Sequence, residues 1–169
     1  MSLFRFLPEI TRARGYHLYT SDGRRFLDMY LEEGRLVMGH RQAGYGLALK
    51  NNVDRGIFSP FPSRYTHRLK RAVQDIFGRE KHVYLFRDSF SAEAALRMED
   101  IEYSTLRPAE MQKGDGILVF ILPVPEALAP GVVVSAEELD LEEDLISPVV
   151  AAGAEKGVRN YISFMKRAP

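Results

Sequence analysis

Six consecutive apolar residues, ILVFIL at 117–122, place the strongest limit on how this chain can fold. A run without alternation of apolar and polar residues is typical of a strand that is buried on both faces. The β-branched run GVVVS at 131–135 and the short apolar run HVYLF at 82–86 predict two more strands. We therefore expect a small sheet with helices flanking it.

Helical patterns lie on either side of these strands. Apolar residues between Ser63 and Phe77 recur at steps of three and four, which marks one face of a helix. Strong helix formers occupy 91–103, and Ser147 followed by Pro148 is a natural start for a terminal amphipathic helix. Strands and helices are therefore mixed along the sequence.

The N-terminal part predicts a β-hairpin, because two runs rich in Tyr, Leu and Phe flank the turn SDG at 21–23. A short helix that stops near Gly56 should follow it. We expect a mixed α/β (α+β) fold, with this hairpin and helices first and then the small sheet. Residues 1–99 would form one segment and residues 100–169 a strand-strand-helix segment packed on it, together one compact domain.

The residue types present exclude several kinds of site. The chain has no Cys, so disulfides, thiolate catalysis and Cys-ligated metals are excluded. Its four His lack the spacing of a ligand pair, so we expect no metal site. No apolar run approaches the ~18–20 residues of a membrane span, and the start MSLFRFLPEI lacks a signal-peptide pattern. We therefore expect a cytoplasmic protein without membrane contact.

Charge is divided unevenly along the chain, although the net charge is zero. Residues 1–99 carry 17 Lys and Arg against 11 Asp and Glu, whereas residues 100–169 carry 6 against 12. Such a division can mark a basic binding face, or two halves or two subunits that attract each other. We favour attraction, because nothing else in the sequence suggests nucleic acid.

Four motifs in the first 97 residues resemble the class III pyridoxal-phosphate-dependent aminotransferases. This fold-type I group includes the ornithine, acetylornithine and glutamate-semialdehyde enzymes. The motifs follow one another in the family's order, over more than half of the chain. They are ARGYHLYTSDGRRFLDM at 13–29, which resembles the opening hairpin, EEGRLVMGHRQAG at 32–44, which resembles the Gly-rich segment, SPFPSRYTHRLKRAVQDIF at 59–77, and VYLFRDSFSAEAALR at 83–97.

The resemblance implies positions for a cofactor and a substrate. In the family, the turn after the 82–86 strand holds the cofactor phosphate, which places Ser89, Phe90 and Ser91 at the cofactor-binding positions. Gly39 and His40 lie in the Gly-rich segment and would face the substrate. A His after Gly in a turn can also be a hydrogen-bonded structural residue, and we favour that interpretation.

Two substitutions in the turn oppose phosphate binding. Phe90 replaces the Gly that lets backbone approach phosphate closely. Asp88 replaces an Asn and brings negative charge to the place of a dianion, although it suits a plain helix N-cap. We therefore regard the turn at 89–91 as a vestigial phosphate site.

The residues of pyridoxal chemistry are missing from the rest of the chain. Such an enzyme needs a lysine for the Schiff base and a carboxylate that keeps the pyridine nitrogen protonated. After Ser89 the lysines are Lys113, Lys156 and Lys166, none of which follows a buried strand, and there is no His. We therefore assign no catalytic residue.

Three functions remain open. We favour a shortened aminotransferase relative that binds no cofactor and acts by forming a homodimer, or by binding another partner or a small ligand. The alternative is one subunit of a split aminotransferase, in which a complementary chain supplies the lysine and pyridoxal phosphate is bound. A third possibility is a phosphate- or anion-binding module built on the turn at 85–96.

Overall fold

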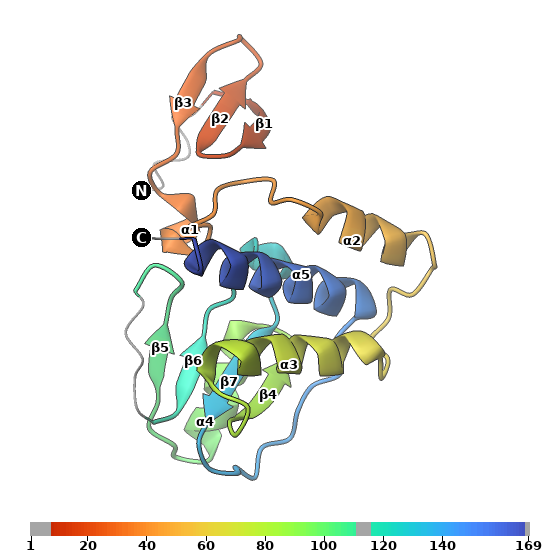
Figure 1. The fold of residues 1–169 in the computed structure, drawn as a ribbon, viewed down its shortest axis with the longest axis vertical. Coiled ribbons are helices and arrows are strands. Elements are labelled where there is room, and N and C mark those ends of the chain that lie inside the picture. Colours follow the sequence, from red (N-terminus) through yellow and green to blue (C-terminus); the bar gives the residue numbers. More distant parts are fainter. Residues whose placement is uncertain (1–7, 111–115, 168–169) are drawn as a thin grey trace.

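A computed structural model describes residues 8–110 and 116–167, which form two sheets and five α-helices (Figure 1). The mixed α/β fold expected from the sequence is confirmed. In chain order the elements are β1 (Ile10–Arg14), β2 (His17–Thr20), β3 (Arg25–Leu27), α1 (Leu31–Gly34), α2 (Tyr45–Val53), α3 (Arg64–Phe77), β4 (His82–Phe86), α4 (Ser89–Met98), β5 (Ser104–Leu106), β6 (Leu118–Phe120), η2 (Glu126–Leu128), β7 (Gly131–Ser135) and α5 (Pro148–Met165).

The N-terminal sheet has the order β1-β2-β3 with antiparallel pairs throughout, and it projects from one end of the molecule (Figure 1). The hairpin β2–β3 was predicted, and its turn contains Gly23 at φ 82°. Strand β1 was not predicted. Its sequence, ITRAR, is charged and mostly exposed, so it lacks the apolar pattern that reveals a buried strand.

The second sheet has the order β4-β7-β6-β5 and contains all three strands that the apolar runs predicted. β7 pairs antiparallel with β4 and β6, while β5 pairs parallel with β6. The expected strand at 117–122 is shortened to Leu118–Phe120, because the chain turns away at Pro123 and Pro125. The two central strands, β6 and β7, are buried along their whole length.

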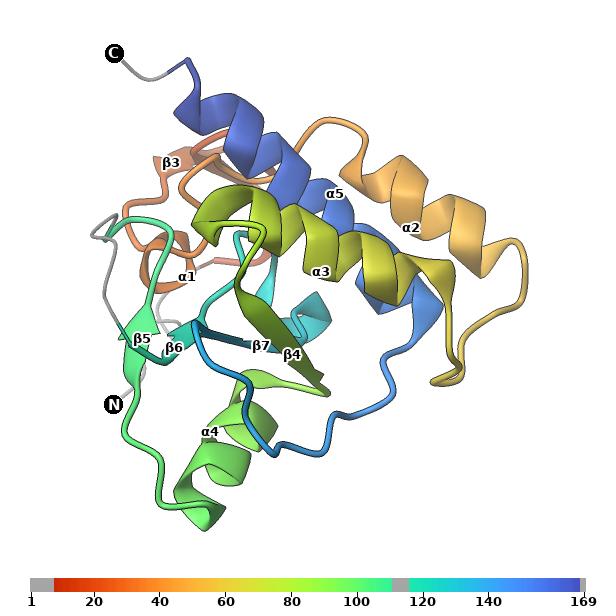
Figure 2. The same ribbon diagram turned by 60° about the horizontal axis from the view of Figure 1, so that its bottom comes forward.

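Helices cover both faces of this sheet (Figure 2). Leu118 and Phe120 of β6 face the layer of α3 and α5, where the Phe120 and Phe77 rings meet edge to face at 5.1 Å. Val119 faces the opposite side and packs with residues of α4. Helix α4 ends at Met98 and does not continue to 103, because the chain reverses at Asp100, which has φ 54°.

The sequence predicted that the terminal helix would be amphipathic, with one buried face. Helix α5 is instead buried around most of its circumference. It lies between α2 and α3, with which it makes its main contacts (Figure 1). Glycines allow the close approach of α5 to α2 and to the segment between β6 and η2. A Cβ on Gly153 would lie 2.7 Å from Leu49 Cδ2, and one on Gly157 would overlap Val124 Cγ1.

The oppositely charged halves of the chain meet within the molecule. Arg68 and Lys70 of α3 pair with Glu155 of α5 and with Glu143, at 3.2 and 2.6 Å. Glu143 also accepts a hydrogen bond from the Leu85 N–H, at 2.8 Å. The acidic loop before α5 therefore covers the outer edge of β4, and the charge attraction operates inside one chain.

Residues 8–110 and 116–167 contain neither a helix with the length and apolar character needed to cross a bilayer nor a cluster of side chains able to hold a metal ion.

Candidate functional site

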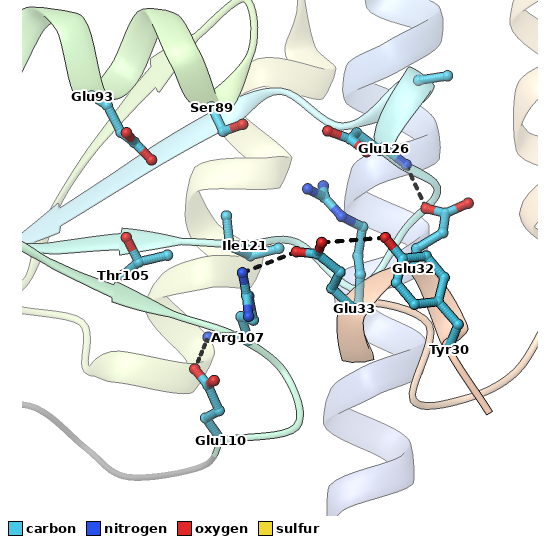
Figure 3. A pocket seen from close by; sticks show the side chains of 12 residues that line it. Tyr30, Glu32, Glu33, Ser89, Glu93, Thr105, Arg107, Glu110, Ile121 and Glu126 are labelled. Atoms are coloured by element: carbon cyan, nitrogen blue, oxygen red, sulfur yellow. Dashed lines mark hydrogen bonds and ion pairs between the residues drawn. The ribbon is translucent and has the colours of Figure 1, made fainter. Parts of the chain in front are cut away.

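A cavity of about 920 Å³ opens where α1, the start of α4, the β5 region and η2 meet (Figure 3). Its wall is rich in charge, with five glutamates and two arginines. The lining residues are Tyr30, Glu32, Glu33, Arg35, Ser89, Glu93, Thr105, Arg107, Glu110, Ile121, Glu126 and Ala127. Five separate stretches of the chain therefore converge on one cavity.

One wall of the cavity is the α1 segment, which has an uncommon backbone. Leu31, Glu32 and Glu33 have φ values of 47°, 50° and 57°, and Gly34 follows at 79°. Successive non-glycine residues in the left-handed region cost about 1–2 kcal/mol each. Such strain persists only where the surroundings hold it in place, and here it brings two adjacent glutamates to the cavity.

Hydrogen bonds hold these glutamates to the opposite wall (Figure 3). The Arg107 guanidinium pairs with Glu33 at 3.1 Å, and the Tyr30 hydroxyl donates to the same carboxylate at 3.2 Å. The Glu126 N–H donates to Glu32 Oε2 at 2.9 Å. Loss of solvent contact and the neighbouring Glu33 carboxylate raise the pKa of Tyr30, which therefore remains a hydrogen-bond donor at neutral pH.

Ser89 and Glu93 project into the cavity from the first turns of α4 (Figure 3). Glu93 accepts hydrogen bonds from Arg97 at 3.1 Å and from the Tyr103 hydroxyl at 3.2 Å. Most of the carboxylates in the wall thus have a donor of their own.

Arg35 lies in the wall without such a partner. Its side chain is only 9% exposed, and no described residue forms a hydrogen bond or ion pair with its guanidinium. None of its nitrogens is among the described side-chain atoms that are buried without a hydrogen-bond partner, so the guanidinium retains contact with the solvent of the cavity.

The start of α4 is a capped helix terminus. Asp88 has extended backbone angles, and its carboxylate accepts a hydrogen bond from the Ser91 N–H at 2.7 Å. That backbone bond, followed by the Ser91 side chain, lowers the pKa of Asp88 despite the opposing effect of burial. Asp88 is therefore ionised at neutral pH and fulfils the N-cap role that its sequence position suggested.

The three residues of the expected phosphate turn lie in different environments. Ser89 lines the cavity, whereas Phe90 and Ser91 are not among its lining residues. The Phe90 ring is 76% exposed and points away from the core. The Ser91 N–H donates its hydrogen bond to the Asp88 carboxylate.

Gly39 and His40 are not among the residues that line the cavity, and they attach the N-terminal sheet to the body of the molecule. Gly15 and His40 exchange two backbone hydrogen bonds, at 3.2 and 2.7 Å. A Cβ on Gly39 would lie 2.6 Å from the Gly15 oxygen, which explains why glycine stands there. The substrate-binding role of this pair remains a prediction, and its position here is that of a structural joint.

His40 also forms a side-chain contact at this joint. Its Nε2 lies 2.7 Å from Asp28 Oδ2, and both side chains are mostly buried. Burial raises the pKa of Asp28, but hydrogen bonds from His40 and from the N–H groups of Leu31 and Tyr30 outweigh it, so the net pKa is lowered. The hydrogen-bonded structural role that we favoured for His40 agrees with this geometry.

The residues around the start of α4 do not fit the phosphate of pyridoxal phosphate. The ionised Asp88 already takes the Ser91 N–H that the phosphate would use. The adjacent cavity carries five carboxylates against two guanidinium groups, which disfavours a dianion. Among the described residues, no lysine lines this cavity, and Lys113 lies outside them.

Sequence reasoning missed most of the cavity. Arg35, Arg107 and Glu126 come from segments far apart in the chain, and no motif connects them. The only local signal is the charged EEGR at 32–35, within a segment that the family resemblance describes as Gly-rich.

Two proteins of similar sequence match parts of this chain. An uncharacterised protein of Borreliella burgdorferi is 30% identical over 139 residues, covering 76% of this chain and 52% of that protein. A glutamate-1-semialdehyde 2,1-aminomutase of Heliobacterium modesticaldum is 32% identical over 68 residues, covering 40% of this chain and 16% of the enzyme. The chain thus spans about half the length of the first relative and less of the second. No protein-family profile matches it.

Solved structures extend the likeness over almost the whole chain. The ornithine aminotransferase of Toxoplasma gondii matches with a TM-score of 0.67 at 10% identity, covering 94% of this chain and 68% of that one. At this identity the likeness is one of fold. The chain therefore has the fold of a fold-type I aminotransferase, in a partial form.

Proposed function

We propose that this chain is an aminotransferase-like protein that does not catalyse transamination by itself, and that it acts by assembly or by binding a small ligand. One observation carries the proposal: the cavity beside the start of α4 is lined with glutamate and arginine, and no described lysine lies in its wall. Schiff-base chemistry needs a lysine amine at the reacting centre.

Reductive trapping tests the absence of catalysis. The purified chain is incubated with pyridoxal phosphate, reduced with borohydride, and analysed by intact mass and peptide mapping. We expect scattered, partial labelling of exposed lysines. One stoichiometric adduct on a single lysine would refute the proposal. The variant Lys113→Gln serves as the control, since it removes the lysine that lies outside the described residues, in the segment after Glu110.

Exposed apolar side chains support assembly. Leu27, the last residue of β3, is 58% exposed, Met29 between β3 and α1 is 80% exposed, and Tyr30 beside them is half exposed. Exposed apolar residues that cluster in this way favour a protein contact. We expect a dimer in size-exclusion chromatography with light scattering, and Met29→Glu should weaken it. Leu145→Glu is the matched control, because Leu145 is also 58% exposed but lies in the loop before α5. A monomer at high micromolar concentration would contradict this part.

The split-enzyme alternative draws support from the partial match to the Toxoplasma gondii chain, of which 68% is covered. On this alternative, a complementary chain would bring the lysine and the phosphate site that the residues here do not supply. A complex isolated from the source cells would then carry one pyridoxal phosphate bound through the partner's lysine. Absence of the chromophore from that complex would exclude the alternative.

A further inference from the structure

We propose that one face of the N-terminal sheet binds the acidic segment 137–142 of a second copy of this chain, in a head-to-tail contact. The inference rests on the proposed function, in which the chain acts by assembly, and it names two surfaces that the assembly uses. A match of charge and of spacing carries it, between two surfaces at opposite ends of one molecule (Figure 1).

Strand pairing places cationic side chains together on one face of the N-terminal sheet. Directly opposed residues of antiparallel strands share a face. Tyr19 is opposed by Arg12 on one side and by Arg25 on the other, and Arg14 is opposed by His17. The basic face therefore consists of Arg12, Arg14, His17, Tyr19, Arg25 and, at its rim, Leu27.

The three arginines of the basic face are exposed. The Arg12 guanidinium stacks on the Tyr19 ring at 4.2 Å, but no ion pair or hydrogen bond joins any of the three guanidinium groups to another described residue. The basic face contains no acidic residue, so its positive charge is directed at the solvent.

The acidic segment presents its carboxylates in a row. Leu139 and Leu141 are partly buried against the core on the α4 side of the main sheet, whereas Glu138, Asp140 and Glu142 are exposed. This alternation is typical of an extended chain with one face buried. The Leu139 N–H also donates to a tyrosine hydroxyl of β4 at 2.6 Å, which fixes the row on the molecule. No described residue forms an ion pair with the three carboxylates.

The ion pairs inside the chain leave both surfaces unmatched. Those between α3 and the acidic half of the chain use Glu143 and Glu155, which lie outside the acidic segment. The N-terminal sheet projects from one end of the molecule, and the blue loop between β7 and α5 lies at the other end (Figure 1). The two surfaces therefore meet only between two copies, where opposite charges attract.

The spacing of the charges matches as well. Arg12 and Arg14 are two residues apart on β1, which separates them by about 6.6 Å along the strand. The exposed carboxylates of the acidic segment are also two residues apart in an extended chain, so they repeat at a similar distance. Each guanidinium can then bind a carboxylate through two parallel hydrogen bonds.

The contact joins different surfaces of the two copies, so each copy keeps one surface free for another. Head-to-tail association therefore extends beyond two chains, whereas the apolar dimer stops at two. Light scattering of the parent at about 1 mM should show species larger than a dimer at about 10 mM salt. These species should be lost at about 1 M salt, because the Debye length falls from about 30 to about 3 Å.

A complementation experiment tests which surfaces meet. Arg12→Gln/Arg14→Gln removes charge from the basic face, and Glu138→Gln/Asp140→Asn removes it from the acidic segment. Each variant alone should lose about tenfold in the salt-dependent association constant, since two exposed pairs are lost. A labelled sample of the first variant should bind the second as the parent binds itself, because one supplies an intact acidic segment and the other an intact basic face.

Lys50→Gln/Arg71→Gln is the matched control, since it removes the same charge from exposed residues of α2 and α3. It should associate as the parent does. Arg25→Gln is a second variant of the basic face, on β3, and it should also weaken the association. Thermal melts establish that each variant folds, and Arg25→Gln decides the test if the β1 variant does not.

Three results would overturn the proposal: no salt-dependent association of the parent, an equal loss in the control, or no recovery in the mixture. Binding of a single-stranded oligonucleotide that needs Arg12 and Arg14, with association of the chains unchanged in their absence, would assign the basic face to nucleic acid and overturn it too. The apolar dimer of the proposed function is tested by Met29→Glu at high salt, so the two failures are distinguishable.

Discussion

Replacement of Asp88 tests whether the start of α4 is held as a capped helix terminus. Asp88→Ala removes the acceptor of the Ser91 N–H, which lies 2.7 Å from the Asp88 carboxylate. Loss of an aspartate N-cap costs about 1 kcal/mol, within a range of roughly 0.5–2. The carboxylate is about half exposed, so the larger cost of breaking a buried ion pair does not apply. For a chain of this size, we expect the melting temperature to fall by about 2–4 °C.

Asp88→Asn is the control, because asparagine caps a helix about as well as aspartate. Thermal melts of the three proteins at pH 7 should place Asp88→Asn close to the parent and Asp88→Ala below both.

The pKa of Asp88 is lowered in the folded chain, so its contribution is present above the ordinary aspartate pKa and lost as the pH falls through the lowered one. The gap between parent and Asp88→Ala should therefore close below about pH 4. Equal stability at pH 7, or a gap that grows in acid, would refute the cap.

Three other substitutions probe the joint, the helix layer and the exposed turn. Asp28→Ala should lower the free energy of unfolding by about 2 kcal/mol, because the mostly buried His40 side chain loses its hydrogen-bond partner. Limited proteolysis should then cut the N-terminal sheet faster. Gly157→Ala should cost about 1–2 kcal/mol in chemical denaturation, since overlap with Val124 outweighs the gain in helix propensity, and a stabilised variant would contradict the packing. Phe90→Ala should change stability by less than about 0.5 kcal/mol, and a much larger loss would mean that the ring packs against the protein.

The buried strands of the main sheet could be predicted because each lies in an unbroken run of apolar residues. The run at 82–86 became β4 with the same bounds, and 131–135 became β7. Strand β1 escaped prediction, because its residues face solvent and it is held by pairing with β2. A strand of this kind depends on its neighbour and leaves no apolar pattern of its own.

The periodicity of apolar residues predicted only part of the burial of helix α5. The sequence predicted the start of the helix at Ser147–Pro148 and one apolar face. The small residues on its other sides, including Gly153 and Gly157, carry no strong apolar signal. Gly153 is buried against Leu49 and Tyr45 of α2, and Gly157 against Val124 in the segment after β6, so their burial is a property of the assembled layer.

By itself, the sequence determined the mixed fold, the capped start of α4 and the departure of Asp88 and Phe90 from a phosphate turn. These features are local, since each depends on residues adjacent in the chain. The tertiary structure alone decided which side chains form the cavity. Arg35 and Glu126 are far apart in the sequence, and they line one cavity only because the left-handed α1 segment and the η2 turn fold against the same end of the sheet. The interaction between two charges depends on their separation in space, whereas the sequence gives only their order along the chain.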